Sequence, residues 1–302
     1  MAAPTVSVVM PTFNRVEYLQ AAIASVYAQT FRDWELIVVD DGSDEQTLNF
    51  LRSRRDPRTT LLCGAHTGNP AVVRNQGLEV ARGRYAAFLD SDDRWREDKL
   101  ERQVALLESA PARRWSYTAV RRIDGGGRVF ARSGVPWVPY SGAILEQVLR
   151  IDAQIATPAV MAELAFVREL GGFDEQLRFS EDYDLWARMA LRSEVSVDRE
   201  ATADVRSHAE HFTFDRAGKL GGWDAFYAKM EGLVPTPELR VLCRRQRREY
   251  VLLLAAQQAR AGDWVGMRHS LRTAVESQAW SPRGWLRVAK AAALPNRQPR
   301  RS

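Results

Sequence analysis

The stretch Glu35-Leu-Ile-Val-Val-Asp-Asp-Gly-Ser43 joins an apolar, β-branched run to an abrupt acidic turn. A short apolar run closed by turn residues is typical of a strand that is buried on both faces. Helical periodicity precedes this run in residues 16–29 and follows it in residues 44–54. The stretch therefore predicts a strand within a βαβ unit, with carboxylates at its carboxyl end.

The same alternation covers roughly the first 120 residues. We predict three more strands, at Val6–Met10 (closed by Pro11), Thr59–Cys63 and Tyr85–Leu89, and a further helix over residues 70–81. Strands that alternate with helices of about ten to fifteen residues indicate a parallel, doubly wound α/β sheet. Ligands bind such sheets at the carboxyl ends of the strands. Three polar clusters follow predicted strands, so we expect one site there: residues 11–15, 40–44 and 90–93.

The pattern becomes mixed after Trp115. We predict a strand over residues 115–123, a glycine turn with a hairpin partner at 128–132, and helices over 141–150 and 162–170. Ser180 is expected to cap a further helix. From about Pro237 the pattern is purely helical. These features predict an α/β domain over residues 1–235, with a division near residue 123, and a basic α-helical extension over 236–302.

Composition indicates an ordinary globular protein. The chain has 302 residues, of which 45% are hydrophobic and 27% charged. Cys63 and Cys243 lack metal-ligand spacing, which argues against a disulfide framework or a zinc site and favours a reducing cytosol. The segment Met1–Val9 has no basic region before an apolar run, so no signal peptide is predicted. No apolar run is long enough to predict a membrane-spanning helix.

Charge is distributed unevenly along the chain. Residues 239–302 contain 14 Arg or Lys and 3 Asp or Glu, a net charge of +11, whereas the remaining residues contain 29 basic and 35 acidic ones, a net charge of −6. The basic extension has two open interpretations, solvated helix faces or attraction to an anionic membrane surface. No nucleic-acid partner is expected, because no motif for reading bases is present.

The segment Phe88-Leu-Asp-Ser-Asp-Asp93 places three carboxylates at the end of a predicted strand. Like charges this close raise one another's pKa unless a cation lies between them. Carboxylate oxygens suit Mg²⁺ or Mn²⁺, which is commonly shared with a substrate phosphate. The alternative is a solvated loop, in which Asp93 caps the helix predicted to begin near Glu97.

Five segments together resemble family 2 glycosyltransferases, in the order and spacing of that family and over roughly Thr5–Phe214. They are Val6-Ser-Val-Val-Met-Pro-Thr-Phe-Asn-Arg15, Ser25-Val-Tyr-Ala-Gln-Thr-Phe31, Trp34-Glu-Leu-Ile-Val-Val-Asp-Asp-Gly-Ser43, Phe88-Leu-Asp-Ser-Asp-Asp93, and Gly171-Gly-Phe-Asp-Glu175 with Glu181-Asp-Tyr-Asp-Leu-Trp186. The resemblance implies a GT-A fold, here a mostly parallel sheet flanked by helices. It also implies inverting sugar transfer from a nucleotide-diphosphate sugar, with Mg²⁺ or Mn²⁺ as cofactor.

The resemblance further implies roles for individual residues on the donor side. In the segment Pro11–Arg15, Thr12 and Phe13 would contact the nucleoside, and Asp41, beside Asp40, would bind the base. From the residue types alone, Thr12 and Asn14 offer short polar groups and Arg15 can approach a diphosphate or ribose. The alternatives are a plain strand-to-helix turn after Pro11 and an N-cap turn that involves Asp44. Asp92 would bind the metal, with Asp90 on the ribose or on a metal-bound water and Ser91 between them. His208 would complete the metal coordination, and His211 competes for that role. Arg74, near the start of a predicted helix, could face phosphate oxygens.

On the acceptor side, the resemblance places the acidic pair Glu181 and Asp182 under the acceptor. An inverting displacement needs a base for the acceptor proton, and we assign that role to Asp182, with Glu181 second. The alternative for this pair is capping of the helix dipole. Trp186 would support the helix or form the floor of the sugar pocket. Gly172 would shape the acceptor pocket, because glycine permits close backbone approach.

Two other classes of protein share parts of this pattern. A nucleotidyltransferase also combines a doubly wound sheet with metal carboxylates, but residues 11–15 lack the glycine-rich basic loop expected there. A dinucleotide oxidoreductase is disfavoured because no GxGxxG follows the first strand. A catalytically inert carbohydrate-binding scaffold is the non-enzymatic alternative. The expected partners are a UDP-sugar donor and a glycan or lipid-linked acceptor, at a cytoplasmic location, peripheral at the inner face of the membrane.

Overall fold

The computed structural model describes residues 3–54, 56–130, 137–207, 216–276, 285–286 and 288–290. The chain separates into two compact units. The first comprises Met1–Gln176 and Leu185–His211, and the second comprises Leu177–Asp184 and Phe212–Ser302. The division that we predict at residues 235 and 236 stays a prediction, and each unit is described below by itself.

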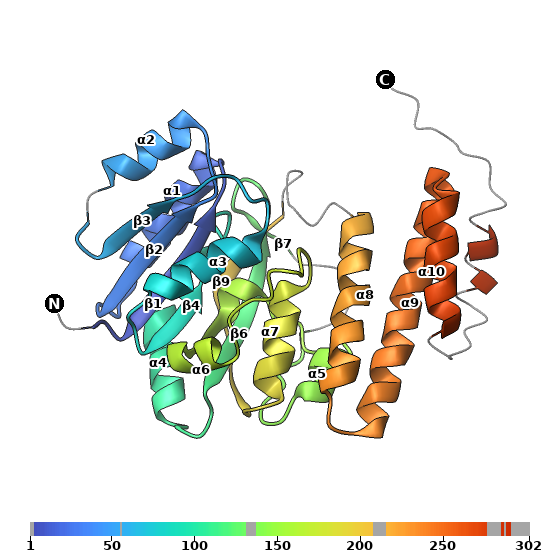
Figure 1. Cartoon of the computed structure of the whole chain (residues 1–302). Coiled ribbons are helices and arrows are strands. Elements are labelled where there is room, and N and C mark those ends of the chain that lie inside the picture. Colours follow the sequence, from blue (N-terminus) through green and yellow to red (C-terminus); the bar gives the residue numbers. More distant parts are fainter. Residues whose placement is uncertain are drawn as a thin grey trace. The chain divides into compact units, whose positions relative to one another are not determined.

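A nine-stranded sheet forms the centre of the first unit (Figure 1), in the order β3-β2-β1-β4-β8-β6-β9-β5 with β7 beside β6. Its strands are β1 (Val6–Thr12), β2 (Trp34–Asp40), β3 (Thr59–Cys63), β4 (Tyr85–Phe88), β5 (Arg94–Trp95), β6 (Trp115–Ile123), β7 (Val129–Phe130), β8 (Val160–Glu163) and β9 (Val195–Arg206). The helices of this unit are α1 (Val16–Tyr27), α2 (Glu45–Ser53), α3 (Pro70–Val80), α4 (Lys99–Glu108), α5 (Leu145–Leu149), the 3₁₀ turn η1 (Thr157–Ala159), α6 (Leu164–Glu169) and most of α7 (Glu181–Ala190).

Strands β1 to β4 run parallel, as the sequence predicts. In their register Thr12 lies beside Asp40, and Asp40 lies beside Cys63, so the three carboxyl ends reach the same edge. The predicted end of the first strand at Pro11 is wrong, because β1 continues to Thr12. Strand β4 pairs with β1 only as far as Val9. Pro11 therefore lies where β1 has a single neighbour, a position at which proline is tolerated.

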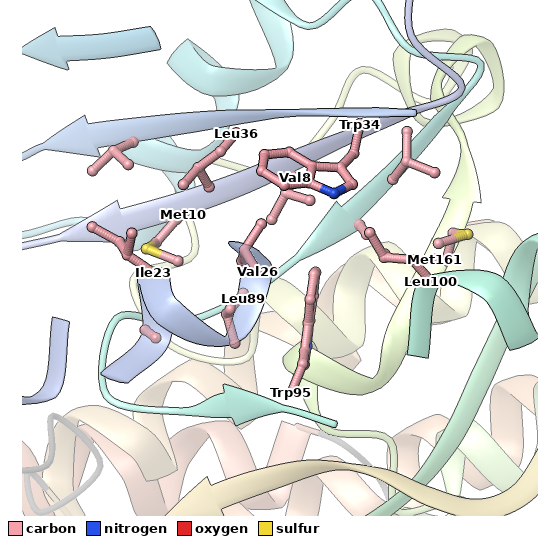
Figure 2. Packing of buried hydrophobic residues seen from close by; sticks show 14 of the residues in the cluster. Val8, Met10, Ile23, Val26, Trp34, Leu36, Leu89, Trp95, Leu100 and Met161 are labelled. Atoms are coloured by element: carbon pink, nitrogen blue, oxygen red, sulfur yellow. The ribbon is translucent and has the colours of Figure 1, made fainter. Parts of the chain in front are cut away.

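Helices cover both faces of this parallel part. Val8 and Met10 of β1 pack against Ile23 and Val26 of α1, in a cluster that also contains Leu100 of α4 (Figure 2). Val9, between Val8 and Met10, points to the opposite face of the sheet. There it packs closely against Gly77 of α3, where an added Cβ would lie 2.6 Å from the Val9 side chain. Because successive side chains of a strand point to opposite faces, β1 packs against a helix on each side of the sheet, as in a doubly wound fold.

Beyond Trp115 the structure departs from several predictions. The hairpin of β6 with β7 is confirmed. The helix predicted over residues 162–170 is wrong at its start, because β8 occupies 160–163 and α6 follows. The helix predicted over 141–150 is shorter and spans Leu145–Leu149. The long strand β9 was not predicted, although it pairs with β6 over the whole of that strand.

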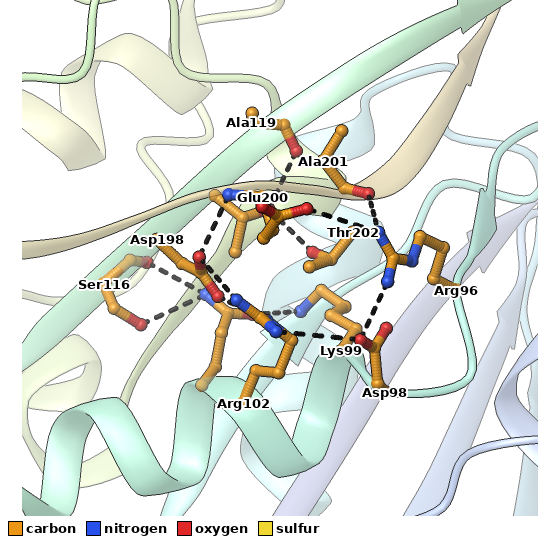
Figure 3. Close-up of polar contacts among 12 residues, drawn as sticks. Arg96, Asp98, Lys99, Arg102, Ser116, Ala119, Asp198, Glu200, Ala201 and Thr202 are labelled. Carbon is orange, nitrogen blue, oxygen red and sulfur yellow. Dashed lines mark hydrogen bonds and ion pairs between the residues drawn. The ribbon is translucent and has the colours of Figure 1, made fainter.

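A polar network joins α4 to β9 (Figure 3). The Arg102 guanidinium donates to both oxygens of Asp198, at 2.6 and 3.0 Å. Lys99 is fully buried, donates to Gln103 at 2.5 Å, and lies 4.1 Å from the centre of the Trp95 ring. Burial lowers the pKa of Lys99 well below its usual value. The helix begins at Lys99 with Asp98 before it, two residues later than predicted.

The described residues of the second unit form helices joined by loops. It contains the first turn of α7, α8 (Arg216–Leu233), α9 (Pro237–Ala261) and α10 (Trp264–Glu276). Thr236 caps α9 by accepting from the Leu239 amide. Trp223 of α8 stacks on Tyr250 of α9, at 5.4 Å between ring centres. Among the described residues, no helix is long and apolar enough to cross a membrane.

Candidate active site at the carboxyl edge of the parallel strands

The turn after β1 is held against the turn after β2. The Asp41 amide donates to the Thr12 carbonyl at 2.9 Å, and the Asn14 amide donates to the Ser43 hydroxyl at 2.7 Å. Asn14 and Arg15 both have positive φ, 56° and 62°. Two consecutive non-glycine residues in the left-handed region are uncommon, and such strain collects at functional sites. The Thr12 hydroxyl is buried and has no hydrogen-bond partner among the described residues.

Asp40 and Asp41 have different partners. One oxygen of Asp40 accepts from the amides of Gly42 and Ser43, at 3.2 and 3.0 Å, and so shapes the turn. Asp41 instead reaches the segment after β3, where it accepts from the Thr67 amide and hydroxyl, at 2.7 and 2.9 Å, and from the Gly68 amide. The last residue of this cluster, Asp44, caps α2 by accepting from the Thr47 amide, and that bond lowers the Asp44 pKa.

His66 is a residue that we did not predict at this site. Its Nδ1 lies 3.0 Å from the Asp41 carboxylate, and its ring stacks on Phe13 with 4.0 Å between ring centres. Phe13 is 40% exposed, so this aromatic pair borders solvent at the strand edge. The signal that could have indicated His66 is its position just after the third parallel strand, by the rule used for the other clusters.

Two arginines meet the acidic segment after β4. Arg74 of α3 donates to Asp90 at 2.7 Å, and Arg15 donates to Asp92 at 3.2 Å. Arg74 is buried, and its guanidinium lies 5.2 Å from the centre of the Phe173 ring. The structure therefore brings together residues from the segments after β1 and β4 and from α3, as the sequence predicts. Ser91, between the two acids, is partly exposed.

Asp93 has a different role from its neighbours. It is buried and accepts from the Arg206 amide at 2.8 Å, while the Arg206 side chain donates to the Asp92 carbonyl at 2.7 Å. Burial raises the pKa of Asp93 well above its usual value, and the charges of Asp92 and Asp90 add to this effect. The alternative in which Asp93 caps the next helix is wrong, since it holds β9 instead.

The carboxylates of Asp90 and Asp92 are hard oxygen donors of the type that fits Mg²⁺ or Mn²⁺. Their side chains are 29% and 9% exposed, so both retain access to a ligand. Within the described ranges, no three His, Cys, Asp or Glu side chains are grouped to hold a metal. His208 and His211 lie outside the described residues. The donor set here thus fits an ion that takes its other ligands from a bound substrate and water.

Gly172 makes a close contact within the protein. Its φ is +69°, and a Cβ there would lie 2.6 Å from the Asn75 side-chain oxygen. Asn75 of α3 accepts from the Phe173 amide at 2.9 Å and donates to its carbonyl at 2.8 Å. The absence of a side chain at Gly172 therefore allows the turn to hydrogen-bond with Asn75 of α3. The contact of Gly172 with an acceptor stays a prediction.

Trp186 is fully buried. Its ring centre lies 6.1 to 6.4 Å from those of three other aromatic residues, Phe88, Phe173 and Trp115. Of the two roles that we considered for Trp186, this packing favours support of the helix over the floor of a sugar pocket. A substrate contact of Trp186 stays a prediction.

The first turn of α7 lies in the second unit and carries Glu181, Asp182 and Asp184. Ser180 precedes the helix with a φ of +65°, and its carbonyl accepts from the Asp184 amide. Its hydroxyl is buried and has no partner among the described residues, so the predicted side-chain cap is not formed. Asp184 is fully buried and pairs with Lys229 of α8 at 2.8 Å. The roles of Glu181 and Asp182 stay predictions.

The carboxyl edge of strands β1 to β4 lies within a segment that matches a protein-family model. The model of glycosyl transferase family 2 matches residues 7–162, which is more than half of the chain and includes the ends of β1, β2, β3 and β4. The chain belongs to this family. The resemblance that we drew from the five segments is confirmed.

Several curated relatives are similar over longer stretches. An uncharacterized glycosyltransferase of Rickettsia bellii is 32% identical over 215 residues, 71% of this chain and 30% of that protein. The chain thus spans about a third of the length of the first relatives it matches. WcaA of Escherichia coli K12, named for colanic acid biosynthesis, is 29% identical over 75% of this chain and 81% of its own. WfgD of E. coli, named as a UDP-Glc:α-D-GlcNAc-diphosphoundecaprenol β-1,3-glucosyltransferase, is 41% identical over 34% and 40%.

Solved structures share the fold. S. aureus TarS 1-349, solved in complex with UDP-GlcNAc, has a TM-score of 0.64 at 16% identity and covers 90% of this chain and 89% of its own. The mannosyltransferase PcManGT of Pyrobaculum calidifontis, solved with GDP-Man and Mn²⁺, has a TM-score of 0.62 at 15% identity, with 97% and 81% covered. The predicted GT-A class, a curled and largely parallel sheet flanked by helices with a helical C-terminal region, is confirmed.

Proposed function

We propose that this chain is an inverting glycosyltransferase that moves a sugar from a nucleotide-diphosphate sugar to an acceptor hydroxyl in glycoconjugate biosynthesis. The observation that carries the proposal is the family match across the strand edge where Arg15 meets Asp92 and Arg74 meets Asp90. Family membership also argues against the nucleotidyltransferase alternative. A uridine nucleotide is the favoured donor, since TarS was solved with UDP-GlcNAc and WfgD is named for UDP-Glc.

On the donor side, Thr12, Asp41 and Asp90 would bind the nucleoside. The Thr12 hydroxyl is buried and has no hydrogen-bond partner among the residues that the structure describes, so it is free to bond a ligand. Arg15 and Arg74 would meet the diphosphate, for which guanidinium groups have matching geometry. Both arginines are held by carboxylates before substrate arrives, which fixes their direction and reduces the cost of ordering them on binding.

Asp92 and Asp90 would hold Mg²⁺ or Mn²⁺, with His208 as a further proposed ligand. A divalent ion bound there would neutralise charge that develops on the departing diphosphate. The PcManGT structure, which was solved with GDP-Man and Mn²⁺, supports this choice of metal by analogy of fold.

On the acceptor side, Asp182 would remove the proton of the attacking hydroxyl, with Glu181 as the second candidate. The acceptor oxygen forms a bond to the anomeric carbon while the bond from that carbon to the phosphate oxygen breaks. The nucleoside diphosphate leaves with the electron pair, and the proton passes to the carboxylate. Attack from the face opposite the leaving group inverts the anomeric centre.

We propose a lipid-linked or glycan acceptor and a peripheral position at the cytoplasmic face of the membrane. The support is the name of WfgD, which specifies a diphosphoundecaprenol acceptor, and the net charge of +11 over residues 239–302. Attraction of a basic segment to anionic lipid is worth about 1 kcal/mol per Lys or Arg.

The test is release of nucleotide from a panel of UDP-, GDP- and dTDP-sugars, with Mn²⁺, with Mg²⁺ and with a chelator. We expect turnover of one nucleotide class, loss of turnover on chelation, and an inverted anomeric centre in the transferred product. Absence of binding and turnover with every donor and metal would favour the inert scaffold. Turnover that is indifferent to chelation would contradict the metal.

A further inference from the structure

Helix α10 packs into its own unit through one face. Met267, Leu271 and Ala274 of α10 lie against a row of small and branched residues on α9, which includes Val251, Ala255 and Ala259. Ser270, on the same face, donates to Gln258 of α9 at 2.9 Å. In the part of the chain that the structure describes, these contacts use the inward apolar stripe of α10 and do not involve Trp264, Val265 or Val275.

The outward face of α10 is nevertheless apolar in part. Trp264, Val265 and Val275 are 47%, 74% and 61% exposed. Arg268 and Arg272 lie at i+4 and i+8 from Trp264 and are exposed on the same face. The sequence from 264 to 275 contains no Asp or Glu. Exposed tryptophan and valine interleaved with arginine are typical of helices that lie in a membrane interface.

The charge of the chain favours a lipid occupant for this face over a protein one. Residues 239–302, which include α10, carry +11, whereas the rest of the chain carries −6. An anionic bilayer complements both features, since the arginines meet phosphates and the tryptophan ring lies at headgroup depth. A second copy of the same face would instead bring Arg268 and Arg272 against their own copies, an unfavourable contact between like charges.

We propose that the outward face of α10, centred on Trp264, Val265, Arg268 and Arg272, is a docking surface for anionic lipid headgroups. Through this face, α10 would lie in the plane of the bilayer surface and would not cross the bilayer. This proposal deepens the peripheral position proposed above and rests on it, but it does not depend on which sugar the enzyme transfers.

The experiment is sedimentation of the full chain with vesicles of phosphatidylcholine alone or with about 30% phosphatidylglycerol, over a range of salt. We expect binding to the anionic vesicles only. Arg268→Gln with Arg272→Gln should weaken it about fivefold per arginine, or about 1 kcal/mol each. Trp264→Ser with Val265→Ser should weaken it about tenfold and remove most of what remains at high salt.

Matched controls come from the first unit. Val129→Ser removes an apolar side chain of similar exposure, 55%, and Arg32→Gln removes an exposed arginine. Both should bind vesicles as the parent does, and thermal melting should confirm that every variant is folded. If the α10 variants bind as well as these controls, or if the parent shows no anionic preference, the proposal is overturned.

Two further measurements separate the alternatives. If the tryptophan and valine substitutions convert a dimer to a monomer in sedimentation velocity and leave vesicle binding intact, the face is a self-association surface and the proposal is wrong. Nucleotide-sugar hydrolysis in detergent-free buffer reports the proposed function alone. Hydrolysis without selective vesicle binding would overturn only the proposed lipid-docking surface. Selective vesicle binding without hydrolysis would overturn only the proposed glycosyltransferase function.

Discussion

Strands β1 to β4 and strands β6, β8 and β9 form one sheet by two different routes. In the first region, parallel strands are joined by single helices, so each strand and the helix after it carry a regular local pattern, even though β1 pairs with the distant β4 as well as with β2. In the second, β8 lies between β4 and β6 and is antiparallel to both, and β6 pairs with β9 some eighty residues later. Local patterns therefore predict the first region well and the second region poorly.

The same contrast applies to the polar residues. The segments after β1, β2 and β4 are fixed by bonds among themselves, such as Asn14 with Ser43 and Arg15 with Asp92. The acidic turn of α7 is fixed by a helix far along the chain, through Asp184 and Lys229. We infer that donor binding belongs to the locally encoded region and that proton transfer belongs to α7. Three predictions test this division.

The largest effect is expected from Asp182→Asn. Loss of the base should reduce sugar transfer by about a thousandfold, within the range that general-base groups contribute. Donor affinity, measured by calorimetry, should change by less than about twofold. Glu181→Gln is the matched control. It should retain most activity, because the base role is assigned to Asp182 and Glu181 is only the second candidate. Near-parental transfer by the Asp182 variant would remove it from the base role.

A stability effect of about 3 kcal/mol is expected from Gly172→Ala. The alanine would adopt a left-handed backbone, and its Cβ would lie 2.6 Å from the Asn75 oxygen. Gly171 also has a positive φ, but no atom of the described residues lies within 4 Å of a Cβ there, so Gly171→Ala should cost only about 1 kcal/mol. Chemical denaturation measures both. Equal losses would mean that the contact between Gly172 and Asn75 does not hold the two regions together.

The smallest effect is expected from Lys99→Met, in the network between α4 and β9. Because burial lowers the pKa of Lys99, the folded state binds fewer protons than the unfolded state below about pH 10. The free energy of unfolding should therefore rise with pH above neutrality, by at most about 1.4 kcal/mol per pH unit. Lys99→Met should flatten this rise between pH 7 and pH 9.5, and Lys219→Met, at an exposed lysine, should not. An unchanged slope in both would contradict a neutral Lys99.

Sequence predicted the parallel strands and the positions of Thr12, Asp41 and Asp90 because each depends on a strand and the turn that follows it. It missed β8 and β9 because neither strand belongs to a regular alternation of strand and helix, and pairing with distant strands, antiparallel for β8 and parallel for β9 with β6, leaves no local periodic signal. Helix-like spacing in residues 160–163 was outweighed by the ladders on both sides.

His66 was missed for a related reason. Its role depends on a ring stack with Phe13 and a contact with Asp41, which are 53 and 25 residues away in the sequence. For Trp186 the sequence left two roles open, support of the helix and the floor of a sugar pocket. Its burial among Phe88, Trp115 and Phe173 could be seen only once the sheet was assembled.

The central claim is that the carboxyl edge of β1, β2 and β4 binds a nucleotide diphosphate together with a divalent ion. Calorimetric titration of UDP in the presence of Mn²⁺ tests it most directly, with Asp92→Asn compared against Asp44→Asn, which keeps the cap of α2. We predict Mn²⁺-dependent binding that Asp92→Asn weakens at least about tenfold and that Asp44→Asn leaves unchanged. Equal affinities for the two variants, or binding that is indifferent to Mn²⁺, would contradict the account.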